Sequence, residues 1–212
     1  RMSEVIEQEL DPPLNARICI LSGPNLSTEI ADGVPALTVL ASNDTALANA
    51  AQSALMTDNF RIYTNADVIG VELAGALKNI VAIGAGICDG LGYGNNAKAA
   101  FVTRGLAEIT KIGIQAGANP MTFAGLAGFG DLMATASSSL SRNRYLGEEL
   151  GKGKTLDEIR ESMHNVTEGV DSTSAALMMA DRYNVDIPIT KTIYRILFEG
   201  LDLLPRGFLR GT

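Results

Sequence analysis

The sequence predicts a two-part α/β chain, in which an alternating strand and helix region over residues 1–66 precedes an all-helical region over residues 67–212. Two observations predict this division. In the front third, short runs rich in β-branched and apolar residues alternate with helical stretches. After Asp67 the strand signal disappears, and long helical periodicities take its place.

The front region is expected to contain three strands and two helices. The strands are expected at Arg17–Leu21, Ala36–Ala41 and Phe60–Thr64, and the helices at Ser27–Ala31 and Thr45–Met56. This is too little for an independent sheet with its own ligand crevice, so we expect that the complete protein begins upstream. The region then reads as the tail of an α/β sheet. In a dinucleotide-binding, Rossmann-like protein the first strand would carry a glycine-rich phosphate turn, which this sequence lacks.

The second region is predicted to be helical throughout. Helical patterns cover Val68–Ile87, Asn96–Gly117, Arg142–Leu150, Thr155–Ser162, Asp171–Tyr183 and Thr190–Glu199. Thr155 and Glu158 form a capping-box pattern, and Gly151 and Gly200 stand where helix ends are expected. The second region, residues 67–212, is therefore expected to form an all-helical domain.

The composition excludes several function classes. The net charge of −7 argues against a nucleic-acid surface, which needs clustered Lys and Arg. Cys19 and Cys88 lie far apart without a CxxC pattern and His164 is the single histidine, so the sequence supports neither a disulfide framework nor a zinc site. Any anionic ligand is expected to be small and held by local cations.

The sequence gives no sign of secretion or membrane insertion. The segment RMSEVIEQEL is charged and lacks an apolar signal core. Glu72 and Lys78 interrupt the longest apolar stretch, so no run reaches the ~18 uncharged residues of a membrane span. We expect a soluble cytoplasmic protein with no membrane span.

Lys78 is the first candidate catalytic residue. It is the only charged residue between Leu73 and Cys88, and it shares a helix face with Ala74, Gly75 and Ala82, which leave room for a ligand. An apolar setting disfavours the charged form of an amine, so a lysine there can exchange protons near neutral pH. The alternative is that Lys78 extends its ammonium from the helix edge into solvent.

Two glycine patterns do not read as nucleotide-binding turns. The segment IGAGICDG has its third glycine one position late and lies within a helical pattern. Gly90, Gly92 and Gly94 are instead expected to form a flexible loop, closed by a helix cap at Asn95 or Asn96.

A helix start at Ser141-Arg142-Asn143-Arg144 is a candidate anion site. Free backbone N–H groups, the positive end of the helix dipole, the Ser141 hydroxyl and an arginine fork suit a phosphate or a carboxylate. Asp131, in a stretch of small and apolar residues, needs a partner such as Lys78 or a substrate hydroxyl. Equally, it could cap the helix that starts after Gly130.

Four segments together resemble the bacterial NAD(P)-dependent glycerol-3-phosphate dehydrogenases. They are SGPN at 22–25, VELAGALKNIVAIGAGICDGLGYGNNAKAA at 71–100, GFGDLMATASSSLSRNR at 128–144 and TEG at 167–169. The resemblance runs from about Val5 to Gly200. It implies reversible hydride transfer between dihydroxyacetone phosphate and sn-glycerol 3-phosphate with NAD or NADP, the supply of glycerol phosphate for phospholipid synthesis, and a homodimer as an open possibility.

The resemblance also implies that residues 1–66 are the remnant of a dinucleotide-binding, Rossmann-like domain and that residues 67–212 form the substrate and catalytic domain. It further implies roles for individual residues. Lys78 would be the proton donor and acceptor. The substrate would contact Gly23, Lys78, Asp131, Ser141, Arg142 and Asn143, and the cofactor would contact Asn25, Ser27, Arg142, Val166 and Glu168. This agrees with the chemistry, because ketone reduction builds negative charge on oxygen that an ammonium can neutralise and protonate. No metal is required.

Two departures and two alternatives accompany the resemblance. Asn25 stands where bacterial relatives often have Thr. The glycine-rich turn and a substrate-binding Lys-Gly pair of the family would precede residue 1, so we expect the chain alone to be inactive. A non-catalytic helical interaction module is one alternative, and another two-domain dehydrogenase, of the hydroxyacyl or sugar-acid type, is the second.

Overall fold

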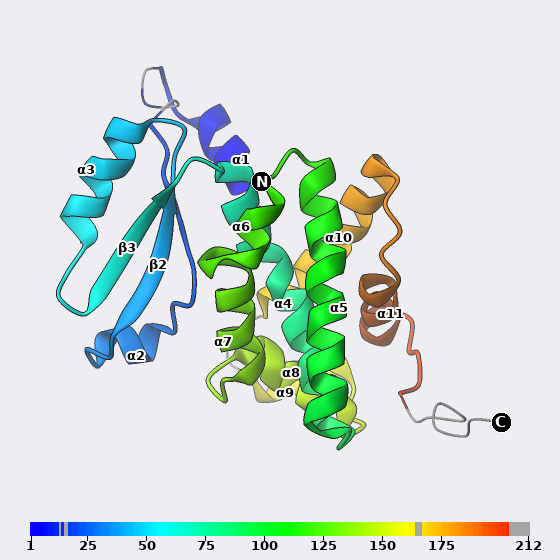
Figure 1. Ribbon diagram of the computed structural model, residues 1–212. Helices are drawn as coiled ribbons and strands as arrows, with labels where there is room; N and C mark the ends of the chain where they lie inside the picture. The colour runs from blue at the N-terminus through cyan, green and yellow to red at the C-terminus, as the bar shows by residue number, and fades with distance from the viewer. Residues whose placement is uncertain (13, 15–16, 164–166, 204–212) are drawn as a thin grey trace.

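A computed structural model describes residues 1–12, 14, 17–163 and 167–203 of the chain. Figure 1 shows a small sheet with one flanking helix beside a larger group of helices. The strands are β1 (Ile20–Ser22), β2 (Ala36–Ala41) and β3 (Phe60–Asn65), and the helices between them are α2 (Ser27–Ala31) and α3 (Thr45–Leu55). The predicted alternation of strands and helices in the front region is therefore confirmed.

The sheet has the order β1-β2-β3 and is mixed. Strands β2 and β3 pair in parallel from Ala36 with Phe60 to Ala41 with Asn65, whereas β1 runs antiparallel to β2. The first strand was expected at Arg17–Leu21, but pairing begins only at Ile20, which lies opposite Ala41 at the end of β2. Among the described residues, the pairing of β1 with β2 therefore starts at Ile20.

The remaining helices fill the rest of the described chain. They are α1 (Met2–Glu9), α4 (Val68–Gly90), α5 (Gly94–Gln115), α6 (Pro120–Ala124), the π-helical turn η2 (Leu126–Gly130), α7 (Asp131–Ser137), α8 (Arg142–Gly151), α9 (Leu156–Ser162), α10 (Glu168–Tyr183) and α11 (Pro188–Phe198). The six predicted helices are confirmed, with ends shifted by a few residues. The capping box of Thr155 and Glu158 is also formed.

Between residues 118 and 130 the structure adds two short helical segments, α6 and η2, that the sequence did not predict. Their start signal is present, because Asn119 accepts the Met121 N–H at 2.9 Å and Pro120 occupies the first helical turn. Short segments of this kind carry too little periodicity to stand out. The helix expected after Gly130 is confirmed as α7, which follows η2 directly.

The expected glycine loop is shorter than predicted. Helix α4 continues to Gly90 and α5 already begins at Gly94, so Asn95 and Asn96 lie within α5 and do not cap it. Gly92 and Gly94 have φ angles of 69° and 77°, which residues with a Cβ rarely adopt. These two positions close a tight connection between two long helices.

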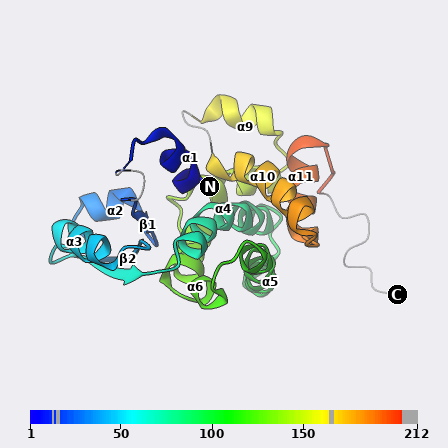
Figure 2. The ribbon, with the colours of Figure 1, turned by 90° about the horizontal axis from the view of Figure 1, so that it is seen from above.

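Helix α4 is the centre of the helical part, with α5, α6 and α10 around it (Figure 2). By length and hydropathy it could cross a membrane, contrary to the expectation from Glu72 and Lys78, but 61% of its most apolar window is buried inside the protein. Leu73, Leu77 and Ile80 on this helix belong to the main hydrophobic core. Its apolar character is explained by burial on several faces.

Glycines let the backbones of α4 and α8 touch. A Cβ on Gly86 would overlap the Arg144 carbonyl oxygen, and one on Gly147 would overlap the carbonyl oxygen of Ile83. Gly90 meets the Glu148 carbonyl oxygen in the same way. Because backbone atoms cannot move aside as a flexible side chain can, this crossing fixes the position of α8 relative to α4.

Gly147→Ala is expected to lower the free energy of unfolding by about 1–3 kcal/mol, the usual cost of overpacking, or more if the helices separate. In a chain of this size that corresponds to a fall in melting temperature of about 2–4 °C per kcal/mol. Thermal unfolding followed by circular dichroism measures it. Gly125→Ala is the control, because a Cβ there meets nothing closer than 3.4 Å. Equal melting temperatures of the two variants would contradict the close crossing.

Candidate functional site

A cleft of about 590 Å³ opens between the end of β1 and the helices that follow. Its lining comes from the β1–α2 segment, α4, α7, and the first turns of α8 and α10, and consists of Asn25, Leu26, Ser27, Thr28, Gly75, Lys78, Asn79, Thr135, Leu140, Ser141, Arg142, Asn143 and Glu168. The structure thus gathers segments that are more than 140 residues apart into one place.

Lys78 and Asp131 form the buried ion pair of this cleft. The Lys78 ammonium donates to Asp131 Oδ1, and the two side chains are 16% and 3% exposed. Thr135, one helical turn after Asp131, donates its hydroxyl to the Asp131 carbonyl oxygen at 2.7 Å. The ammonium is therefore bound to a carboxylate inside the protein. The alternative interpretation, a lysine that extends its ammonium into solvent, is wrong.

Asp131 is the first residue of α7, but its carboxylate accepts a hydrogen bond from Lys78, and no side chain in the described part of the chain caps this helix. Burial raises the pKa of the Asp131 carboxyl, although the Lys78 charge, the bond from Lys78 and the bond from Thr135 all oppose that rise. A buried carboxylate and an ammonium in contact take up and release protons as one coupled pair. The pair therefore has the composition of an acid–base centre.

Arg142 lies at the mouth of the same cleft. Its Nη2 is 2.6 Å from Glu168 Oε1, and the two side chains are 46% and 55% exposed. Arg144 does not join it: its Nε bonds Asp89 at 2.8 Å and its Nη2 lies 3.3 Å from Glu148. The two arginines of this helix start therefore serve different places, because residues two positions apart on a helix point in different directions.

The two other residues of the helix start hold the site together. Ser141 accepts the backbone N–H of Arg144 at 3.2 Å and caps α8. Buried Asn143 accepts the N–H of Gly169 at 2.9 Å. A Cβ on Gly169 would lie 2.5 Å from Asn143 Oδ1, so the first turn of α10 is seated directly on α8.

On the sheet side, Asn25 presents a free acceptor. Its Nδ2 donates to Thr38 Oγ1 at 2.9 Å, while its Oδ1 is buried and has no hydrogen-bond partner within the described part of the chain. Such an acceptor normally requires a donor. Gly23 does not line the cleft and lies behind it, where a Cβ would come within 2.9 Å of Thr38 Oγ1. Its lack of a side chain permits this close approach.

The structure thus brings together most of the residues singled out from the sequence. Those in the cleft wall are Asn25, Ser27, Lys78, Ser141, Arg142, Asn143 and Glu168, with Asp131 behind Lys78 and Gly23 behind Asn25. Val166 lies outside the described residues. Sequence reasoning assigned no role to Asn79, Thr28 or Thr135, although Thr135 stands four residues after Asp131, which is helical spacing.

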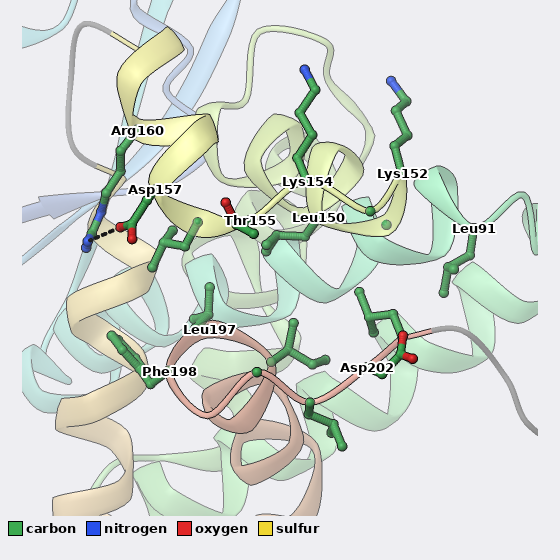
Figure 3. A pocket seen from close by; sticks show the side chains of 17 residues that line it. Leu91, Leu150, Lys152, Lys154, Thr155, Asp157, Arg160, Leu197, Phe198 and Asp202 are labelled. Carbon is green, nitrogen blue, oxygen red and sulfur yellow. Dashed lines mark ion pairs between the residues drawn. The ribbon is translucent and has the colours of Figure 1, made fainter.

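A second cavity, of about 690 Å³, lies between the α8–α9 connection and the residues after α11 (Figure 3). Its cations are already paired within the protein: Lys152 lies 2.8 Å from Glu148, and Lys154 lies 2.5 Å from Glu149. None of the residues singled out from the sequence as site residues lines it. The smaller cleft, which holds Lys78 and Arg142, is therefore the candidate site.

Comparison with known families identifies the chain. The model of the NAD-dependent glycerol-3-phosphate dehydrogenase C-terminus matches residues 67–204, and that of the N-terminus matches residues 1–48. The chain belongs to the NAD-dependent glycerol-3-phosphate dehydrogenase family. Membership of this family confirms the resemblance found in the sequence. It does not support the two alternatives, a non-catalytic helical interaction module and a dehydrogenase of the hydroxyacyl or sugar-acid type.

Individual members of the family show the similarity in more detail. The glycerol-3-phosphate dehydrogenase [NAD(P)+] of Dehalococcoides mccartyi is 53% identical over 95% of the chain and 56% of its own length. That of Macrococcus caseolyticus is 53% identical over 96% of the chain and 61% of its length. The crystal structure of the Coxiella burnetii enzyme superimposes with a TM-score of 0.85 at 41% identity, over 87% of the chain and 57% of that structure. The chain therefore spans little more than half the length of these relatives.

Proposed function

We propose that this chain forms the substrate site and part of the cofactor site of an NAD(P)-dependent dehydrogenase that interconverts dihydroxyacetone phosphate and sn-glycerol 3-phosphate. The observation that carries the proposal is one cleft holding both the buried Lys78–Asp131 pair and the Arg142 guanidinium. The first supplies a proton-transfer centre and the second an anion contact. A phosphorylated three-carbon ketone requires both.

Lys78 acts as the acid in ketone reduction. Its ammonium hydrogen-bonds the carbonyl oxygen, stabilises the negative charge that develops there and delivers the proton that makes the hydroxyl group. In the reverse direction the neutral amine accepts the hydroxyl proton. Asp131 orients the ammonium and compensates its charge, and Thr135 helps to fix Asp131.

Arg142 binds the phosphate end of the substrate, since its fork of N–H donors matches a phosphate oxygen pair. Ser141 and Asn143 lie beside it at the start of α8, where the helix dipole also favours an anion. The anchored phosphate then places the carbonyl carbon near Lys78. Gly23 supports this arrangement by keeping the β1 end close to Thr38.

The nicotinamide cofactor fits the opposite wall of the cleft. The buried, unpartnered Oδ1 of Asn25 can accept an N–H from a carboxamide, and Ser27 is a neighbouring hydroxyl. Glu168 and Val166 complete the proposed cofactor contacts. Bound NAD(P)H would supply the hydride. We retain the division into a cofactor part, residues 1–66, and a substrate part, residues 67–212.

The proposal extends to the cellular role. The enzyme supplies glycerol phosphate for phospholipid synthesis in the cytoplasm, and it acts as a homodimer. The test uses the complete gene product that contains this sequence, with NADH and NADPH oxidation followed at 340 nm as an absorbance assay. Turnover with dihydroxyacetone phosphate, and little with unphosphorylated dihydroxyacetone, is expected. Oxidation with neither ketone would refute the proposed function, and gel filtration tests the dimer.

A further inference from the structure

Two successive residue pairs join α8 to α10 at the edge of the cleft. Asn143 binds the N–H of Gly169 at 2.9 Å, and Arg142 binds the Glu168 carboxylate at 2.6 Å. The first pair is buried, whereas the side chains of the second are about half exposed. One connection is therefore fixed, and the adjacent one lies open to solvent and ligand.

The fixed connection determines where Glu168 stands. The Gly169 N–H is bonded to Asn143, and there is no room for a Cβ between them, so the first turn of α10 is packed directly against α8. Glu168, the preceding residue, is therefore held within reach of Arg142 whether or not a ligand is present. The carboxylate needs only a side-chain rotation to leave.

The position of Arg142 favours an anionic partner even when no ligand is bound. It is the first residue of α8, where the positive end of the helix dipole disfavours a cation. A carboxylate offers the guanidinium two oxygens in the same plane, as a phosphate does. Glu168 thus presents the same charge and a similar oxygen geometry as the ligand group proposed for this position.

We propose that Glu168 is an internal placeholder for the substrate phosphate: it occupies Arg142 in the free protein, and an incoming phosphate displaces it. This rests on the proposed function. An exposed ion pair contributes little to stability, so it opens readily, and a phosphate, which carries more charge than a carboxylate, replaces it. Glu168 keeps Arg142 extended over the cleft and weakens the binding of singly charged anions, which gain less from the exchange.

The test measures the dissociation constant of inorganic phosphate in the complete protein by isothermal titration calorimetry, for the parent, Glu168→Gln, Arg142→Gln and the double variant. Removing the competing carboxylate is expected to tighten phosphate binding about two- to five-fold, the range for opening an exposed ion pair. In the Arg142→Gln background the same change should have no effect. This coupling separates competition for Arg142 from a general loss of negative charge.

Asp157→Asn is the matched control, because Asp157 is an exposed acid 3.9 Å from Arg160 and does not line the cleft. It should leave phosphate binding unchanged. Weaker or equal binding in Glu168→Gln, equal tightening in the Arg142→Gln background, or no phosphate binding to the parent would each overturn the placeholder role. Failure of the proposed function would look different: the protein would not turn over dihydroxyacetone phosphate, while the four variants would still bind inorganic phosphate as expected.

Discussion

Lys78→Met is expected to lower kcat about 10²–10⁴-fold, the usual cost of losing a general acid or base. Methionine keeps the length and apolar stem of the lysine but cannot neutralise or protonate the carbonyl oxygen. Steady-state kinetics on the complete protein measures the loss. Lys78→Arg should not restore turnover, because a guanidinium stays protonated and its planar fork does not fit a point contact with Asp131.

Lys98 offers a matched control for this experiment. Its ammonium lies 2.7 Å from Asp89, and its side chain is 17% exposed, against 16% for Lys78. It does not line the cleft. Lys98→Met should therefore keep turnover within a few-fold of the parent. Similar activity of the Lys78 and Lys98 variants would end the catalytic assignment of Lys78.

The same change has a pH-dependent effect on stability. Burial already raises the pKa of the Asp131 carboxyl above its unfolded value, and Lys78→Met removes the cation that opposes this rise. A raised pKa in the folded state means that folding favours the protonated acid. The variant is thus most stable below the unfolded pKa of the carboxyl and loses stability as the pH rises through the folded pKa.

Urea unfolding at about pH 5 and about pH 8 measures this dependence. The difference in free energy of unfolding between the parent and Lys78→Met should be larger at the higher pH. Asp131→Asn in the same background removes the titrating group and should remove most of the extra loss. A constant difference across the two pH values would contradict an uncompensated carboxylate at this position.

Arg142→Ala is expected to lower kcat/KM for dihydroxyacetone phosphate about 30- to 150-fold, mainly through KM. Losing a charge-assisted hydrogen bond to phosphate typically costs about 2–3 kcal/mol. Arg144→Ala is the control, since Arg144 is bound to Asp89 and Glu148 instead of lining the cleft. Its KM should stay near that of the parent, whereas an unchanged KM in Arg142→Ala would show that the phosphate binds elsewhere.

Local signals in the sequence determined most of the secondary structure. Apolar periodicity identified α4 and α5, and the TxxE pattern identified the start of α9, because both depend on neighbours within a few residues. The prediction for residues 118–137 was incomplete, since the helices there are too short for an apolar periodicity to show. The start of β1 was misplaced because the extent of a strand depends on its pairing partner.

The chemistry-bearing residue types were also visible in the sequence, but their relations were not. A single lysine in an apolar helix marked Lys78, and the SRNR helix start marked Arg142. That Lys78 binds Asp131, that Arg142 binds Glu168 and that Arg144 turns away to Asp89 were decided only by tertiary structure. Each pair joins residues 26 to 55 positions apart, and the close α4–α8 crossing at glycines, which no local pattern specifies, sets the distance between the proton-transfer pair and the anion contact.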